Sequence, residues 1–277
     1  MTTDNSAAGN IDYAANRRRR ERNRRILYAA LPFASMCLLI AGWLYLAVKY
    51  PTLFPTPEAT WKRLLRMFER PISRMTLFGH IWASLQRVLI ALVASWLAGI
   101  SFGVLIGWNR KARALFGTVF EMIRPIPPLA WIPLIIMWMG IGEAPKIFLV
   151  ALGCFMPMVV NTYTGIRLVD SMHVDVGRMF NANNRQLLWE IAIPAALPAI
   201  FAGIRTSTSS GWMTVLAAEM MSARSGLGFL IIRGMESDDM ALIMVGMITI
   251  GIVGAMLAVI VSYAERKLCP WRTSQLD

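Results

Sequence analysis

Long apolar stretches recur along the chain, separated by short polar segments. Each is long enough for a helix, rising about 1.5 Å per residue, to cross a hydrocarbon core of about 30 Å. This pattern predicts an all-α membrane protein with six membrane-spanning helices. The predicted spans are 26–48, 81–107, 116–140, 147–168, 195–221 and 240–263.

The third predicted span differs from the others because it is rich in proline. Proline breaks the helical hydrogen-bond ladder, and irregular backbone at membrane depth is tolerated only where protein or a water-filled cavity satisfies it. We therefore expect an interrupted helix there. Before the second span, residues 61–70 carry apolar side chains on one helical face and basic ones on the other, which predicts a helix lying in the membrane interface.

Residues 173–193 are polar and amphipathic, although apolar spans lie on both sides. We predict a helix over 174–180, a turn over 181–184 and a second helix over 185–193. Asparagine suits such a turn because it tolerates left-handed backbone angles. Pro194 and Pro198 are expected to interrupt the ladder near the start of the fifth span. Such a knob can dock in a groove of a soluble partner, although an ordinary surface loop would look similar.

Ionisable residues inside the predicted spans are costly and usually face protein or water. Arg87 and Arg205 either do so or reach the interface from span ends. Arg124 lies three residues after Glu121, so a structural ion pair is expected. Glu219 would repel an anion if it were charged and free, so we expect it to be paired, protonated or structural.

Hydroxyl residues gather at the middle of the fifth span. Such groups often bond only to their own chain or to a neighbouring helix, but this density also fits a face that lines a pathway. The candidate pathway residues are Arg124, Thr206, Ser207, Ser210, Thr214 and Glu219.

Composition agrees with the membrane class, since 56% of the 277 residues are hydrophobic and the mean hydropathy is +0.52. The net charge of +12 is explained by loops beside an anionic leaflet better than by nucleic acid. Most of the 28 lysines and arginines fall in segments on the side of the two termini, including the run 17–25. This bias predicts that both termini are cytoplasmic, although the basic segment 62–74 argues the other way.

Motifs for catalysis are absent from the sequence. There is no GxxxxGK[ST] loop for ATP, no HExxH pair and no nucleophile elbow. Cys37, Cys154 and Cys269 are widely spaced, and the two histidines cannot form a histidine metal site unaided. We expect no catalytic residue, metal or cofactor on this chain.

The segment DVGRMFNANNRQLLWEIAIPAALPAIFAGIR resembles the cytoplasmic loop of bacterial ATP-binding-cassette (ABC) import permeases. Asp175 stands at the glutamate of that loop, and Asn181 stands at its glycine. Asp keeps the charge and Asn can keep the turn. The resemblance implies that the following residues contact an ATPase: Asp175, Val176, Gly177, Arg178, Asn181, Ala182, Leu187, Pro194 and Pro198.

Four further segments are similar to the taurine, aliphatic sulfonate and nitrate branch of that family. They are 80–108, 124–152, 211–231 and the closing CPW at 269–271. The resemblance implies the type I ABC importer permease fold and a multi-pass position in the bacterial inner membrane. It also implies a homodimer in lipid, two cytoplasmic ATPase subunits that bind ATP and Mg, an extracytoplasmic binding protein, and no nucleic acid.

Taurine or another aliphatic sulfonate is the first expectation for the cargo. Nitrate, bicarbonate, aromatic acids or a pyrimidine precursor are alternatives within the family. An ATP-independent secondary transporter and a membrane scaffold are alternatives of other classes. We divide the chain into a basic tail at 1–25, a first span and loop at 26–60, a core at 61–268 with the loop 173–193, and a cytoplasmic tail at 269–277.

Overall fold

The computed structural model describes Arg24, Tyr28 and residues 30–269. The predicted basic tail, apart from Arg24, and the last eight residues of the C-terminal tail lie outside the described residues. The chain divides into two compact units, Met1–Thr60 and Trp61–Asp277.

The first unit contains the helix Ala30–Lys49, which is long and apolar enough to cross a membrane. Most of its side chains are exposed, as expected for a helix that contacts lipid around much of its circumference. The indole Nε1 of Trp43 donates to the carbonyl of Pro55 at 2.9 Å, which folds the following loop back onto the helix.

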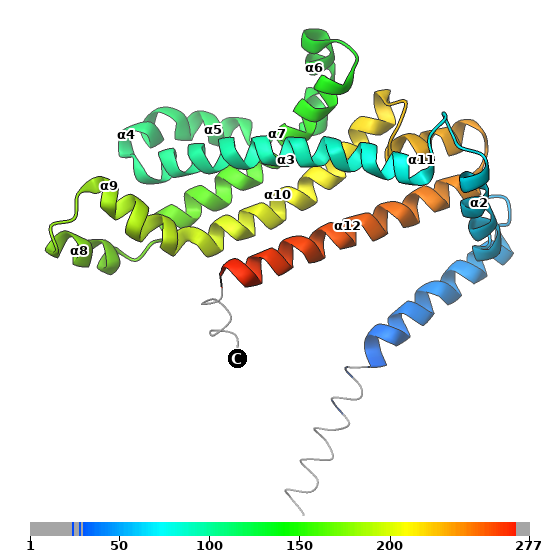
Figure 1. Cartoon of the computed structure of the whole chain (residues 1–277), viewed down its shortest axis with the longest axis horizontal. Helices are drawn as coiled ribbons and strands as arrows, with labels where there is room; N and C mark the ends of the chain where they lie inside the picture. Colours follow the sequence, from blue (N-terminus) through cyan, green and yellow to red (C-terminus); the bar gives the residue numbers. More distant parts are fainter. Residues whose placement is uncertain (1–23, 25–27, 29, 270–277) are drawn as a thin grey trace, which may run out of the picture. The chain divides into compact units, whose positions relative to one another are not determined.

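Helices make up the regular structure of the described residues 61–269 of the second unit, with one isolated bridge between Ile72 and Met75 (Figure 1). The elements are α2 (Pro57–Glu69, which begins in the first unit), α3 (Leu77–Trp108), α4 (Arg110–Ala112), η1 (Arg113–Gly117), α5 (Thr118–Ile123), η2 (Pro128–Trp131), α6 (Ile132–Met139), α7 (Glu143–Arg167), α8 (Ser171–Met179), α9 (Asn184–Gln186), η3 (Leu187–Ala192), α10 (Ile193–Ser222), α11 (Leu227–Glu236) and α12 (Met240–Leu268).

The centre of this unit is α7, which packs along α3 on one side and α10 on the other. Glycines four residues apart on α3 allow the first contact. A Cβ atom added to any of them would come within 3.0 Å of an α7 side chain, so the two backbones lie as close as glycine permits. The opposed pairs are Gly99 with Met158, Gly103 with Thr162, and Gly107 with Ile166.

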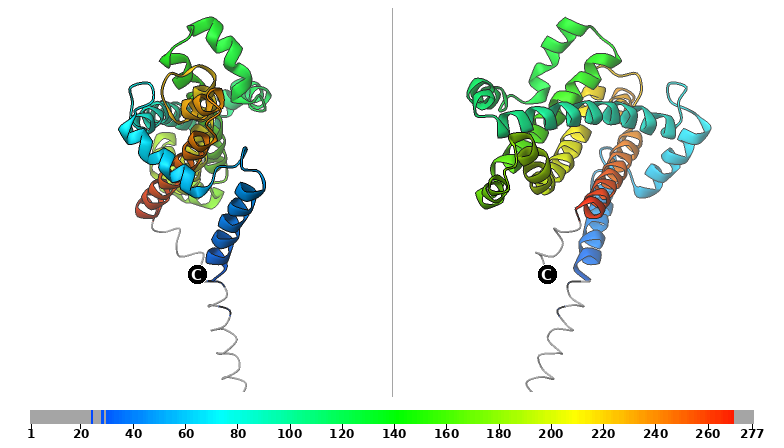
Figure 2. Two further views of the ribbon diagram at one scale, coloured as in Figure 1. Left: turned by 90° about the vertical axis from the view of Figure 1, so that its right-hand side faces the viewer. Right: turned by 60° about the vertical axis from the view of Figure 1, so that its left-hand side comes forward.

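The register of this contact also fixes chain direction. Residue numbers rise together along α3 and α7, so the two helices run parallel. The segment between them must therefore return across the width of the bundle. It does so as a broken span, Arg110–Ile123 followed by Pro128–Met139, with a 90° bend (Figure 2). The expected interruption is confirmed, and the return supports a total of six spans where length alone gives five or six.

The two prolines at the start of α10 do not interrupt the helix, and the prediction that they would is wrong. The helical segment is continuous from Asn184 to Met221. Its ladder widens into a π-helix over Leu187–Ala192, which ends two residues before Pro194. A π-turn shifts the hydrogen-bond pairing, which lets the helix pass a residue that has no N–H donor.

Between the predicted fifth and sixth spans the structure has a further helix, α11, which the sequence pattern did not predict. Its apolar face packs on α12, and Leu227 and Leu230 join the largest buried cluster of the unit. The predicted helix at 61–70 is present as α2. Its Met67 lies in the same cluster, and Arg63 forms an ion pair with Asp239 at the start of α12.

Candidate functional site

The predicted knob is a helix–turn–helix at one end of α7 and α10. Gly177 of α8 is buried, and a Cβ atom there would meet the side chains of Leu187 and Ile191, so the two helical arms touch directly. Asn181 adopts the predicted left-handed backbone, with a φ of 60°. Asn183 and Gln186 form a reciprocal capping box that starts the second arm. The predicted turn chemistry is confirmed.

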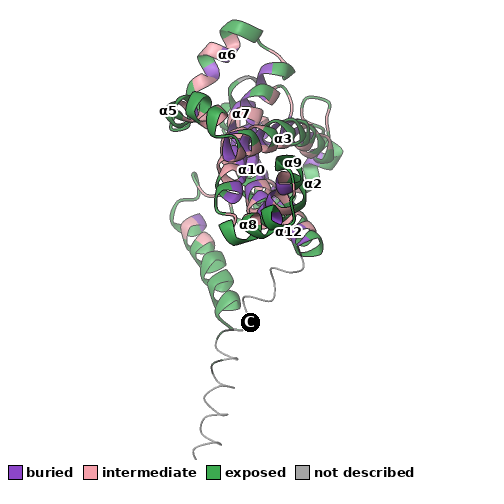
Figure 3. Cartoon of the chain, turned by 90° about the vertical axis from the view of Figure 1, so that its left-hand side faces the viewer, coloured by how far each residue is buried: buried purple, intermediate pink, exposed green. Residues whose placement is uncertain are grey.

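Large apolar side chains on the outside of the knob are exposed, and most of the α8 ribbon has the colour of exposed residues in Figure 3. Met179 and Phe180 are 85% and 84% exposed, and Asp175 pairs with Arg178 at 3.2 Å on the same surface. A cluster of exposed apolar groups rimmed by polar ones is typical of a docking surface. The apolar members are Met172, Val176, Met179, Phe180 and Trp189.

The residues predicted to contact an ATPase occupy two kinds of position. Some are exposed and able to touch a partner, whereas Gly177 and Leu187 are buried and hold the arms together. Ala182 is half-buried in the turn, and Pro194 and Pro198 lie in the first turns of α10. The exposed members are Asp175, Val176, Arg178, Asn181 and Pro194.

A buried polar cluster lies toward the other end of α10, centred on Arg87 of α3. Arg87 uses all five of its N–H groups. Nε and Nη2 bind the two carboxylate oxygens of Glu143 at 2.6 and 2.9 Å. Nη1 donates to Glu219 at 2.6 Å and to the carbonyl of Ser225 at 2.9 Å, and Nη2 also donates to the Ser225 hydroxyl at 3.0 Å. Arg87 therefore lies in the protein interior and does not reach the membrane interface from a span end.

The same cluster supplies the N-terminal cap of α11. Gly226 stands at its N-cap position and has no side chain to satisfy the free N–H groups of the first turn. Side chains of α3 and α10 take that role. The N–H groups of Gly226, Leu227 and Gly228 donate to His80 Nδ1 at 3.1 Å, Ser84 Oγ at 2.9 Å and Glu219 Oε2 at 3.0 Å.

Glu219 is the buried acid of this cluster and is 1% exposed. Of the three states expected for Glu219, the structure shows the paired one. Sequence reasoning did not single out His80, Ser84, Glu143 or Lys146. The sequence pointed to this cluster only through the two charges within spans, Arg87 and Glu219, and the glycine-containing SGLG sequence at 225–228. The ion-pair partners of Arg87 could not be matched to it, because they lie 56 and 132 residues away along the chain.

The hydroxyl residues of α10 mostly serve helix packing. Ser207 accepts from the indole of Trp96 at 2.8 Å, and Ser210 donates to the carbonyl of Gly153 on α7 at 2.8 Å. Thr214 is buried and bonds to its own helix. Ser207, Ser210, Thr214 and Glu219 are thus engaged in contacts within one chain. These contacts do not favour a role for them in lining a transport pathway. Thr206 is exposed.

The two remaining arginines within spans are also paired. Arg124 lies 3.3 Å from Glu121, so the expected ion pair is confirmed, and both side chains are about half exposed beside the break after α5. Arg205 lies 3.3 Å from Glu265 of α12. Among the described residues, no group of three His, Cys, Asp or Glu side chains is placed to hold a metal ion.

A multi-pass helical membrane protein with a broken span and an exposed docking knob has the architecture of a transport permease. The family model described as "Binding-protein-dependent transport system inner membrane component" matches residues 99–271, and the chain belongs to that family. It is therefore an inner-membrane transport subunit rather than an enzyme, and its family implies ATPase and substrate-binding protein partners.

Relatives place the chain within a branch of the family. The taurine transport system permease protein TauC of Escherichia coli is 32% identical over 87% of this chain and 89% of its own length. The putative aliphatic sulfonates transport permease protein SsuC of Bacillus subtilis is 33% identical over 86% of each chain. The nitrate import permease protein NrtB of Synechocystis is 30% identical, covering 86% of this chain and 89% of its own.

Solved structures support the fold. A chain of the MetNI methionine ABC transporter, in an inward-facing conformation, matches with a TM-score of 0.59 over 69% of this chain and 94% of its own. At 16% sequence identity this likeness speaks for the fold alone. It agrees with the expected type I ABC importer permease fold.

Proposed function

We propose that this chain forms the translocation pathway of an ATP-driven importer and couples it to cytoplasmic ATPase subunits. ATP and Mg belong to the ATPase partners. The proposal depends mainly on the exposed surface of the knob. Its exposed apolar surface is built on two helices that pack around Gly177, and it lies where the family's coupling loop is expected.

The pathway is proposed to run between two copies of the chain. Support comes from the broken span, whose exposed residues 124–127 carry two prolines and the Arg124 guanidinium. Polar groups and irregular backbone at membrane depth require covering protein or water. A second copy facing this break would supply both. Thr206 remains a candidate for the same lining, together with Arg124.

The proposed cargo is a small anion, with taurine or another aliphatic sulfonate first. The named substrates of two relatives support this choice. Nitrate is the runner-up, because a third relative is a nitrate permease. Bicarbonate, aromatic acids and a pyrimidine precursor remain further alternatives. We assign most of the selection to the binding protein, since the described hydroxyl groups of α10 are largely used in packing.

Six spans put both termini on one side, and the distribution of basic residues favours the cytoplasm. The knob then lies on the cytoplasmic side, within reach of an ATPase, and the Arg87 cluster lies toward the outer side. A secondary transporter would not need the knob. It would also work without an ATPase, which provides a direct comparison.

The knob is tested by Phe180→Asp, which places a charge on a side chain that is 84% exposed and should not disturb folding. The tagged chain is purified from cells that also express its transport partners. We expect the ATPase subunit to accompany the wild type and to be reduced about tenfold or more with the variant. Burying an uncompensated charge at an interface costs several kcal/mol.

The matched control is Met235→Asp, the same change at a side chain that is 58% exposed on α11, away from the knob. It should retain the ATPase. Equal retention by both variants would show that the knob is not the coupling element. Uptake into vesicles that lack ATP, driven by the wild type alone, would overturn the importer proposal and favour a secondary transporter.

A further inference from the structure

Arg87 and Glu143 are joined by a bidentate ion pair that differs from the other contacts of the cluster in one respect. Each partner holds a second opposite charge. Arg87 also binds Glu219, and Glu143 also accepts from the Lys146 ammonium at 2.7 Å. The four groups carry two positive and two negative charges. If the bidentate pair opened, no buried charge would lose its only counter-charge, so the main penalty for breaking a buried ion pair would be avoided.

The two acids of the cluster are held very differently. The Glu219 side chain is fully buried and binds Arg87, Ser84 and the N–H of Gly228 at once. The Glu143 side chain is 59% exposed and is bound only through side chains of Arg87 and Lys146 in the described contacts. Movement in the cluster is therefore much easier at Glu143 than at Glu219.

The chain before Glu143 can accommodate that movement. Gly140 has a φ of 73°, and a Cβ atom there would have no neighbour within 4 Å. Gly142 is equally open, and α7 begins without a side-chain cap. The preceding helix, α6, rests on a small apolar cluster that is separate from the main core.

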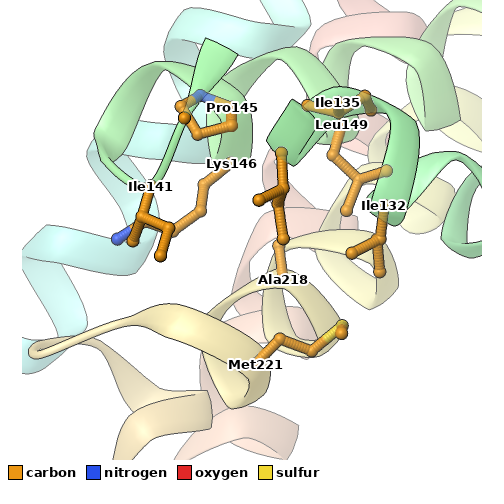
Figure 4. A pocket seen from close by; sticks show the side chains of 10 residues that line it. Ile132, Ile135, Ile141, Pro145, Lys146, Leu149, Ala218 and Met221 are labelled. Atoms are coloured by element: carbon orange, nitrogen blue, oxygen red, sulfur yellow. The ribbon is translucent and has the colours of Figure 1, made fainter. Parts of the chain in front are cut away.

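Figure 4 shows the apolar contact of α6 with α7 and α10. Ile132 and Ile135 of α6 lie opposite Leu149 of α7 and Ala218 of α10 around a small apolar pocket, with Lys146 at its edge. Apolar contacts of this kind are not directional, so α6 can shift on its seat more readily than a hydrogen-bonded element. The pocket thus joins the α6 segment to the same Lys146 that binds Glu143.

We propose that the Arg87–Glu143 pair is an outer latch of the permease. It is closed in this structure and opens during transport, while the Arg87–Glu219 pair and the cap of α11 stay intact. This inference rests on the proposed transport function. Arg87 and Glu143 are positioning residues, because they act through the elements that they join and need not touch the cargo.

The test compares the wild type with Glu143→Gln, which keeps the shape of the side chain and removes its charge. Spin labels are placed at Gln86→Cys on α3 and Ile141→Cys before α7, both exposed, with Cys37 replaced by serine. Labelled chain is diluted with unlabelled chain, so that only distances within one chain are measured. We expect the Glu143→Gln variant to broaden the distance distribution and shift it to longer values, without any transport partner present.

The matched control is Glu236→Gln, which removes an exposed ion pair with Arg233 on α11. Its distribution should equal that of the wild type. Glu143→Asp should restore part of the short distance, because a carboxylate is again available to Arg87. An unchanged distribution in Glu143→Gln, with the protein folded by gel filtration and thermal denaturation, would overturn the latch.

A second measurement uses the full transporter in vesicles. Opening the latch should raise the ATPase rate without binding protein about tenfold in Glu143→Gln, equivalent to about 1.4 kcal/mol. Glu236→Gln should leave it unchanged. If the wild-type rate does not respond to binding protein and cargo, the importer proposal fails, and the distance measurement still decides the latch. If the wild type responds but Glu143→Gln has the wild-type basal rate, the latch fails alone.

Discussion

Single residues decide how the polar cluster is built, and Gly226 is the most constrained of them. Its backbone has φ 117° and ψ 173°, a region that side chains other than hydrogen rarely allow. A Cβ atom there would also enter the space of the Glu219 carboxylate. The residue thus allows the chain to turn and a buried acid to reach the start of α11.

Gly226→Ala should therefore destabilise the protein more than backbone strain alone would. Gly140→Ala is the matched control, since Gly140 has φ 73° and ψ −167° but open space around it. We expect strain of about 1–3 kcal/mol in both variants and an added loss in Gly226→Ala from the displaced carboxylate. Thermal denaturation in detergent measures the difference, and equal losses would contradict it.

Some of the charged contacts could be predicted from the sequence, and others could not. The costs of buried charge identified Arg87 and Glu219 as residues to explain, and the i,i+3 spacing of Glu121 and Arg124 predicted their pair correctly. The partners of Arg87 could not be predicted, because they are distant in sequence and depend on how α3, α7 and α10 align. Glu143 lies between two predicted spans, where a charged residue is common and needs no special explanation.

At the scale of elements, the close packing of α3 on α7 depends on three glycines that face three larger side chains. Association of helices in a membrane relies on such close contact, since lipid is as apolar as the side chains. This glycine stripe, Gly99, Gly103 and Gly107, fixes both the parallel direction and the register of α3 and α7.

Gly103→Val should disrupt this contact, because its Cβ would lie 2.7 Å from the Thr162 Cβ. Forcing extra atoms into a packed interface costs about 1–3 kcal/mol. Gly251→Val on α12 makes the same change in helix propensity where nothing lies within 4 Å of the added Cβ. We expect a lower melting temperature for Gly103→Val only. Comparable melting temperatures in the two variants would show that the stripe is not limiting.

Sequence patterns predicted the existence of the long helices but not their irregularities. Apolar length identified the spans, and proline content identified the broken one correctly. The same proline rule failed at Pro194, since a π-turn restored the ladder. The first turn of α11 is capped by side chains of α3 and α10. A local sequence pattern cannot predict a helix cap that is supplied by other helices.

At the scale of the whole molecule, the second unit has the knob at one end of α10 and the Arg87 cluster toward the other. Because the helix Asn184–Met221 is long and apolar enough to cross a membrane, we expect its two ends on opposite sides. The side that each end faces is what the positive-inside argument predicts.

Cysteine labelling in membrane vesicles checks this arrangement. Met179→Cys on the knob is expected to react with a membrane-impermeant thiol reagent only in inverted vesicles, and Glu236→Cys only in right-side-out vesicles. Both sites are exposed, and Cys37 is replaced by serine beforehand. Labelling of both positions from one side would contradict the six-span topology.

The uninterrupted helix that begins in the knob and ends beside Glu219 has a mechanical consequence. It contains 38 residues, so it forms a rod of about 57 Å. A rod of that kind does not shorten under load, and a push or tilt applied at its cytoplasmic tip is delivered at its far tip. The π-helical segment Leu187–Ala192, within the knob, is the one widened stretch of this helix among the described residues, and it marks where the rod would bend most easily.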